Sequence, residues 1–356
     1  MPRWTLPAGY SPREWMKVGR ISPTWYRRAL AVLLTNSAVL YTLYGIGRLD
    51  LAFYALTGSM LVLYGHEFDL RTRVRKLAGL CVGQAASLLL VGLVASADPG
   101  TPLLVLVGSA LAAAQKLACE RFRVGPPRHV VLVFLDLGIL FAPGIPVSRL
   151  PLSWLTFALC AVWACGIVIA PALWYSRFGR RAWSPGDPPV EADPELLRPA
   201  LRCLVGVAAS GYIAELLGVG RPYWAMVTAA AVFVGTRVQH GQRALQRTVG
   251  TLLGLGVFAI LDQFAKDSDL ILVTLVVASG AIIEVFITAN YWLGTVWVTP
   301  MALLITSLPG NATADTLIGE RLIDTVVGSI IGIVVTLLTD VRPPHQHTHP
   351  HSHPAA

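Results

Sequence analysis

Residues 269–287 read DLILVTLVVASGAIIEVFI, and only Asp269 and Glu284 in this run carry charge. A helix needs about 17–25 mostly apolar residues to cross the hydrocarbon layer of a bilayer, so the run predicts one membrane-spanning helix. The whole chain has a similar character, since 54% of its 356 residues are hydrophobic and only 13% are charged. Soluble domains carry about a quarter charged residues. The sequence therefore predicts an integral membrane protein that is surrounded mostly by lipid.

Eleven further apolar runs accompany this one, and the twelve fall into two groups of six. Tight turns rich in Gly, Asp and Pro join several neighbours. We therefore expect an all-α integral membrane fold with about twelve transmembrane helices. The predicted spans are 26–46, 49–65, 77–96, 102–118, 130–143, 152–175, 201–218, 222–237, 248–262, 269–287, 291–308 and 319–339.

Polar stretches set the expected domain boundaries. We expect a cytoplasmic N-terminal segment at 1–25, a first transmembrane repeat at 26–176, a linker at 177–199 and a second transmembrane repeat at 200–340. The linker is too polar to cross a bilayer and too short to fold alone. The His-rich tail at 341–356 is either unstructured or a weak site for a divalent metal, and nothing in the spacing fixes a geometry.

Basic residues give the expected orientation. If the N-terminus is cytoplasmic, 23 of the 28 Lys and Arg residues fall on the cytoplasmic side of the twelve spans. Cytoplasmic loops of membrane proteins carry such an excess. We therefore expect a multi-pass membrane protein with both termini in the cytoplasm.

The two groups of spans resemble each other. A shift of 171 residues aligns 53–83 with 224–254, and equivalent residues recur in the same order. The aligned pairs include Lys76 with Arg247, Gly79 with Gly250, and Gly83 with Gly254. Because each group has an even number of spans, the sequence predicts two parallel six-helix repeats with a functional site at their interface. The equivalent glycines indicate close helix packing at a shared contact between the halves.

The second group also carries the motifs of a known family. The stretches RPYWAMVT at 221–228, RALQRTVGTLLG at 243–254 and ERLIDTVVG at 320–328 resemble the fusaric acid resistance family, the aromatic acid exporters. The first group looks like a diverged copy without these signatures. The resemblance implies a transporter of the bacterial cytoplasmic membrane for organic anions such as aromatic carboxylic acids.

Basic and aromatic side chains are the candidate substrate-binding residues. Arg243 and Arg247 lie four residues apart and therefore share a helix face. Lys76 aligns with Arg247, and Arg75 lies beside it, so cations from both halves could hold a carboxylate. Simple anchoring at the lipid surface is the alternative. Trp297 is the candidate for stacking on an aromatic substrate, although Trp also favours membrane interfaces.

Acidic residues within the spans are the candidate proton-coupling groups. An unpaired charge at mid-bilayer costs at least about 2.5–3.5 kcal/mol, so Asp136 needs a partner or a proton. Asp136 and Glu284 could couple proton influx to substrate exit, and structural pairing with Arg is the alternative. Arg321 and Asp324 lie three residues apart, which predicts a structural pair on one helix face.

Other functional classes find little support in the sequence. There is no phosphate-binding glycine loop, nucleophile elbow or metal triad, so we expect neither an enzyme nor a cofactor. No basic domain suggests nucleic-acid binding. We expect an exporter of organic anions with the bilayer and a small anion as its partners, and coupling to protons is left open. A passive anion channel and a non-transporting membrane scaffold are the alternatives, and homo-oligomerisation is also left open.

Overall fold

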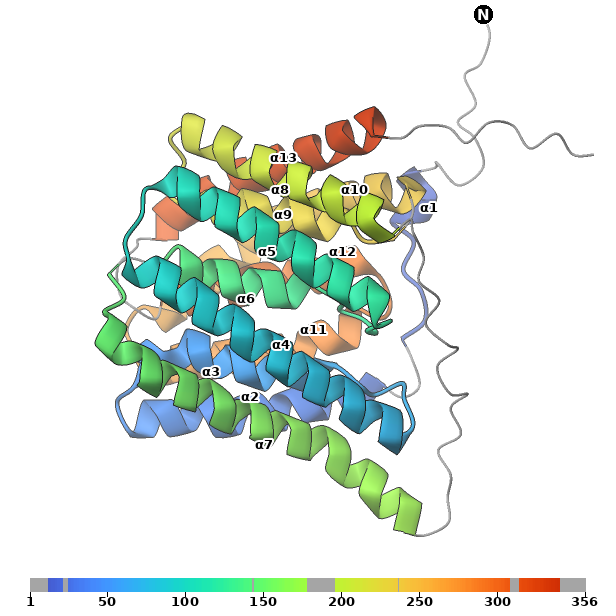
Figure 1. Ribbon diagram of the computed structural model, residues 1–356, viewed down its shortest axis with the longest axis vertical. Coiled ribbons are helices and arrows are strands. Elements are labelled where there is room, and N and C mark those ends of the chain that lie inside the picture. Colours follow the sequence, from blue (N-terminus) through green and yellow to red (C-terminus); the bar gives the residue numbers. More distant parts are fainter. Residues whose placement is uncertain are drawn as a thin grey trace, which may run out of the picture.

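The computed structural model describes residues 12–21, 25–142, 144–177, 196–235, 237–307 and 314–339. Most of the linker expected at 177–199 and the whole tail at 341–356 lie outside these residues, as do 1–11 and 22–24. The described parts of the chain are helical, with helices running alongside one another (Figure 1). This confirms the all-α prediction.

Each of the twelve predicted spans overlaps one helix. The first six helices are α2 (Trp25–Gly45), α3 (Ala52–Ser59), α4 (Leu70–Ser96), α5 (Thr101–Arg121), α6 (Val130–Leu140) and α7 (Leu150–Arg177). The other six are α8 (Leu197–Leu216), α9 (Tyr223–Val232), α10 (Arg237–Ala265), α11 (Asp269–Phe286), α12 (Tyr291–Ser307) and α13 (Ala314–Leu338). A four-residue helix, α1 (Pro12–Trp15), precedes them, and short 3₁₀ turns occur as η1 (Leu49–Leu51), η2 (Met60–Leu63) and η3 (Val147–Arg149).

Two helices begin well before their predicted spans. Helix α4 begins at Leu70 rather than 77, and α10 begins at Arg237 rather than 248. Both extensions are rich in Arg, and that of α10 also contains Gln239, Gln242 and Gln246. A search for apolar runs detects only the part of a helix that lies in hydrocarbon, so the polar first turns were missed.

Six of the described helices are long and apolar enough to cross a membrane. They are Leu70–Ser96, Thr101–Arg121, Val147–Tyr175, Gln239–Ala265, Asp269–Phe286 and Ala314–Leu338. Large apolar side chains such as Val82, Leu159 and Val162 are exposed on the outer faces of these helices. Lipid is the solvent that accommodates such faces, so the chain is a multi-pass membrane protein.

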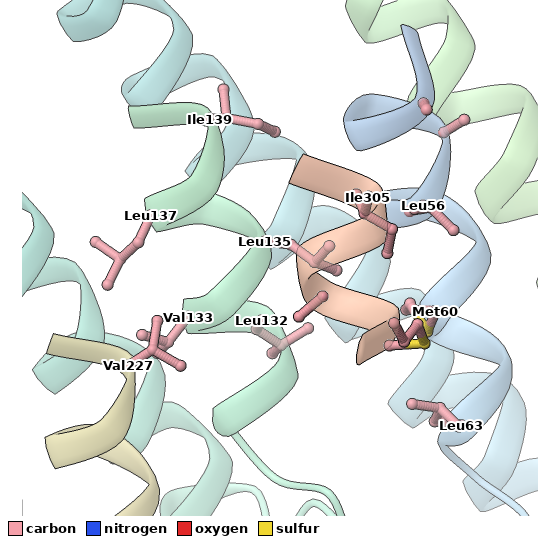
Figure 2. Packing of buried hydrophobic residues seen from close by; sticks show 14 of the residues in the cluster. Leu56, Met60, Leu63, Leu132, Val133, Leu135, Leu137, Ile139, Val227 and Ile305 are labelled. Carbon is pink, nitrogen blue, oxygen red and sulfur yellow. The ribbon is translucent and has the colours of Figure 1, made fainter. Parts of the chain in front are cut away.

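Three shorter apolar helical segments form the interior. They are Leu49–Leu63, Val130–Leu140 and Tyr223–Val232. All ten residues of α9 are buried, and a helix that is apolar on every side belongs in a core. Figure 2 shows Val133 of α6 reaching toward Val227 of α9, and Leu135 on the side of α6 that faces α3.

Helix pairs recur between the two halves of the chain. Helix α2 packs against α11, and α5 packs against α8. Within the halves, α3 packs on α7 as α9 packs on α13, and α4 contacts α6 as α10 contacts α12. The pairs α2 with α11 and α5 with α8 each join a helix of the first half to a helix of the second, so these two pairs hold the halves together.

The predicted glycine contact between the halves is wrong. Gly250 and Gly254 lie against α12, within the second half, where an added Cβ at Gly250 would stand 2.6 Å from the Trp292 carbonyl oxygen. Their counterparts Gly79 and Gly83 have open space around them, with nothing within 4 Å of an added Cβ. The small-residue spacing in the first half therefore does not mark a close helix contact.

Candidate functional site: an arginine-rich cavity between the halves

A cavity of about 710 Å³ lies among helices of both halves. Its wall is formed by α2, α3, η2, the loop at 126–128 and α6 from the first half and by α9 to α13 from the second. Among the described residues, the charged groups in the wall are Arg28, Arg128, Arg243, Arg247, Arg321 and Glu284. Five cations and one acid give this cavity, here called the arginine cavity, a net positive charge that favours anions.

Arg247 is a buried cation with neutral partners. It is only 4% exposed, and its Nη1 and Nε donate to the Tyr291 hydroxyl (3.1 Å) and the Thr228 hydroxyl (3.3 Å). Within the described residues, both of its hydrogen-bond partners are hydroxyl groups. The guanidinium of Arg243 lies 4.2 Å from the centre of the Tyr291 ring. The predicted pair Arg243 and Arg247 therefore faces the cavity around one tyrosine.

Arg321 and an aromatic group form another part of the wall. The Arg321 guanidinium lies 4.3 Å from the centre of the Trp224 ring, an arrangement that stabilises a cation. The Trp224 ring stacks on Phe134 of α6, with ring centres 5.5 Å apart. Trp224, Phe134 and Tyr291 all line the cavity. Flat aromatic surfaces thus lie beside the cationic groups.

Arg28 is the cavity cation that has acidic partners. Its Nε lies 3.1 Å from Glu284 Oε2, and its Nη1 lies 3.7 Å from Glu67. It also donates to the carbonyl of Leu63 at the end of η2 (3.0 Å). His66 lies three residues after Leu63. Burial is the main cause that lowers the pKa of its imidazole, and the positive charge of Arg28 acts in the same direction. Glu284 therefore sits in the wall as the counter-ion of Arg28.

The other predicted site residues lie away from the cavity wall. Lys76 donates to the carbonyls of Phe122 (2.8 Å) and Arg123 (2.9 Å), just beyond the end of α5, where a cation is favourable. Arg75 is exposed on α4. Trp297 is half-buried on α12 and packs against the apolar core.

Asp136 occupies a separate polar site inside the first half. It is fully buried, and it accepts hydrogen bonds from Gln84 Nε2 (2.6 Å), Ser87 Oγ (2.7 Å) and Gln115 Nε2 (2.5 Å). These donors come from α4 and α5, so the carboxylate ties three helices together. Its partners are neutral, and it does not border the arginine cavity.

The predicted pair of Arg321 and Asp324 makes no hydrogen bond. Arg321 lies over Trp224, as described above, and both carboxylate oxygens of Asp324 lack a hydrogen-bond partner among the described residues. Sequence reasoning also missed Arg28 and Arg128 as cavity residues. Nothing in their local sequence distinguishes them from basic residues that anchor helix ends.

Residues 15–19, here called the N-terminal strap, are held at the edge of the cavity. Gln246 and Asn290 donate to the Trp15 carbonyl at 2.6 and 3.1 Å, and Asn290 also donates to the Lys17 carbonyl at 2.6 Å. Gln246 and Asn290 both line the cavity. The second half therefore holds, by hydrogen bonds, a segment that precedes the first half in the sequence.

Comparisons with known proteins place the second half in a family. Residues 207–335 match the fusaric acid resistance protein-like family. An uncharacterized membrane protein of Bacillus subtilis, YvaC, is 36% identical over 139 residues, which cover 38% of this chain and 22% of that protein. The uncharacterized protein ORF2 of Neisseria gonorrhoeae is 27% identical over 150 residues, or 42% of this chain and 36% of the relative.

These matches cover only part of each protein. The uncharacterized protein slr1298 of Synechocystis is 26% identical over 149 residues, which are 41% of this chain and 19% of the relative. The chain thus spans well under two thirds of the relatives it matches, and no solved structure matches it. Residues 207–335, which carry Trp224, Arg247 and Arg321 of the cavity wall, are a fusaric acid resistance protein-like domain.

Proposed function

We propose that the protein transports organic anions across a bacterial membrane, in the direction of export that its fusaric acid resistance likeness implies. The observation that carries this proposal is the arginine cavity, whose wall holds five arginines and one carboxylate. Arg247 has neutral hydrogen-bond partners among the described residues. A buried cation without a counter-ion is costly, so an anionic ligand would stabilise it.

The cavity's chemistry favours aromatic carboxylates. Arg243 and Arg247 are placed to hold the carboxylate, since guanidinium groups bind carboxylates with two hydrogen bonds. Phe134, Trp224 and Tyr291 line the cavity beside them and give an aromatic substrate apolar ring surface to contact. In this proposal Lys76 and Arg75 gather anions from outside the cavity, and Trp297 supports the wall from behind.

We further propose that the twelve helices cross the membrane as two parallel repeats with both termini cytoplasmic. The recurring pairs support this, because α2 with α11 corresponds to α8 with α5. The axis that exchanges these pairs passes between the halves, where the cavity lies. Arg28, Arg128 and Arg243 would then stand at the cytoplasmic end of the cavity, which suits capture of anions from the cytoplasm.

We assign proton dependence of binding to Glu284 and, more remotely, to Asp136. Protonation of Glu284 would release Arg28 (3.1 Å away) for a substrate anion. A proton and an anion would then bind together. This is the opposite of the exchange that the sequence suggested, in which protons enter as substrate leaves. A proton would therefore accompany the anion.

The test is uptake of radiolabelled benzoate into proteoliposomes that contain the full chain. We expect flux above empty vesicles and a reduction of at least about tenfold when Arg243 and Arg247 are both replaced by Gln, equivalent to about 1.4 kcal/mol. Lys266→Gln is the matched control, since Lys266 is exposed and hydrogen-bonds Gln263. Unchanged flux in the double variant would remove the two arginines from the pathway.

Two further outcomes separate the competing functions. Flux that ignores a pH gradient would indicate a passive anion channel rather than a proton-linked carrier. No flux for any acid in a panel of aromatic and aliphatic carboxylates would indicate a scaffold.

A further inference from the structure

Asp324 is a buried carboxyl group whose usual partners are engaged elsewhere. It lies on α13, one helical turn after Arg321, and its side chain has no exposed surface. Neither carboxylate oxygen has a hydrogen-bond partner among the described residues. The previous acid on this helix, Glu320, has its own cation, because it pairs with Arg221.

The charged groups around Asp324 do not neutralise it directly. Arg321 is the nearest cation on α13, and its guanidinium is directed to the Trp224 ring and the cavity. Helix α9 contributes Tyr223, and α10 contributes Arg247; both interact electrostatically with this part of α13. Helix α8, the other neighbour of α13, carries Glu215 near its end at Leu216. Among the described residues, Arg321 is therefore the cation best placed to serve as a counter-ion, and it would have to leave the ring of Trp224.

An ionised carboxylate in such a place is unfavourable. Burying an ionised group without a partner costs far more than burying a neutral hydrogen-bonding group. A protonated carboxyl group avoids most of that cost. The observed arrangement, with Arg321 turned away and both oxygens unpartnered, matches the neutral acid.

We propose that Asp324 is a proton-binding site, occupied in this conformation, and that its proton is linked to anion binding in the arginine cavity through Arg321. Loss of the proton to water leaves a carboxylate, which draws Arg321 from the cavity as its counter-ion. Uptake of one proton restores the acid and returns Arg321 to the cavity. The proton and the anion therefore bind together, and this linkage rests on the proposed function above.

The protonation state is tested without any anion. Infrared spectra of the full chain in lipid nanodiscs at neutral pH should contain a carbonyl band of a protonated carboxylic acid that is lost in Asp324→Asn. The band should persist in Glu320→Gln, the matched control one turn away. Asp324→Glu should retain a band at a shifted frequency, which guards against a folding defect in the Asn variant. A spectrum that is unchanged in Asp324→Asn would overturn the proposal.

The linkage is tested by calorimetric titration with benzoate in buffers of different protonation enthalpy. The Glu284→Gln variant, which lacks the other proposed proton-linked carboxyl group of the cavity, should take up close to one proton per benzoate at a pH where Asp324 is ionised without ligand. Its affinity should there fall by up to about tenfold per pH unit. Adding Asp324→Asn to this variant should abolish proton uptake on benzoate binding, and adding Glu320→Gln should leave the uptake unchanged.

The outcomes distinguish this linkage from the transport proposal. Benzoate binding to Glu284→Gln with no proton uptake, or uptake that persists when Asp324→Asn is added to it, would overturn the linkage and leave the cavity's function intact. If neither benzoate nor any acid of the panel binds the wild-type protein, the proposed function fails and the linkage with it. The infrared result would still decide whether Asp324 holds a proton.

Discussion

Arg28 and Glu284 show how one residue pair can set the affinity of the whole cavity. Glu284 is the single acid among the described charged groups of the wall, and it lies 3.1 Å from Arg28. An anion that binds near Arg28 must compete with this carboxylate. Removing the competitor should therefore help binding rather than harm it.

We expect Glu284→Gln to tighten benzoate binding at neutral pH by about three- to tenfold, or about 0.7–1.4 kcal/mol. Isothermal titration of the purified protein measures this. Glu67→Gln is the control, because Glu67 lies farther from Arg28, at 3.7 Å, and is largely exposed. Weaker binding in Glu284→Gln would show that the Arg28–Glu284 pair maintains the structure of the cavity and that Glu284 does not compete with the anion for Arg28.

Asp136 is expected to act through stability. Asn in its place offers one acceptor oxygen to donors from Gln84, Ser87 and Gln115, so at least one buried donor loses its partner. Each such loss costs about 1–3 kcal/mol. Thermal unfolding in detergent should show a lower Tm for Asp136→Asn than for the exposed-site control Asp267→Asn. Equal Tm values would count against this network.

Cavity residues differ in how far the sequence could predict them. Arg243 and Arg247 share a helix face by their spacing, and they do face the cavity. Lys76 aligns with Arg247, yet it binds carbonyls just beyond the end of α5, because sequence equivalence does not fix what a long side chain meets. Arg28 joins the site only through tertiary contacts that no local pattern encodes.

Helix packing separates two glycine pairs that look alike in sequence. The pair at 250 and 254 lies against α12, and the pair at 79 and 83 borders open space. The spacing of four residues predicts a small-residue face in both cases, and only the neighbouring helix decides whether that face is used. The short helices show the same limit of sequence reasoning. Their apolar composition predicted membrane spans, but it could not show that these helices form the core.

We expect Gly254→Val to destabilise the protein and Gly83→Ala to be tolerated. A Cβ at Gly254 would stand 2.8 Å from the Val296 carbonyl oxygen, so α10 and α12 must move apart at a cost of about 1–3 kcal/mol. At Gly83 the added methyl meets nothing within 4 Å, and helix propensity should add up to about 1 kcal/mol. Thermal unfolding of both variants, with Gly254→Ala as an intermediate, measures the contrast.

At the scale of the whole molecule, composition was enough to predict a multi-pass helical membrane protein. Apolar runs and turn residues located the helices from α2 to α13, but six of the described helices, not twelve, are long and apolar enough to cross a membrane. The cavity did not, because its wall is assembled from side chains of both halves that lie up to about 290 residues apart, from Arg28 to Arg321. Apolar runs identify helices and give no information on which helices meet.

The proposed topology predicts that the basic ends of α4 and α10 lie on one side of the membrane. In a cysteine-free background, single cysteines at Arg75 and Gln239 should both react with an impermeant maleimide only in inside-out vesicles. Cysteines at Arg149 and Lys266 should react only in right-side-out vesicles. Labelling of Arg75 and Gln239 from opposite sides would exclude parallel repeats.

The N-terminal strap is held through the carbonyl groups of Trp15, Met16 and Lys17, so the side chains of Met16 and Val18 contribute little to that attachment. We expect substitutions at Met16 or Val18 to leave this attachment unchanged, so sequence variation at these positions should be tolerated. Gly19 is the exception, because its N–H donates to the Ala289 carbonyl and an added Cβ would stand 2.9 Å from that oxygen. A scan of this segment would therefore locate its dependence at Gly19, and a scan of the turn between α11 and α12 would locate the matching dependence at Asn290. An attachment of this kind would escape notice in a survey of side-chain variation in the strap alone.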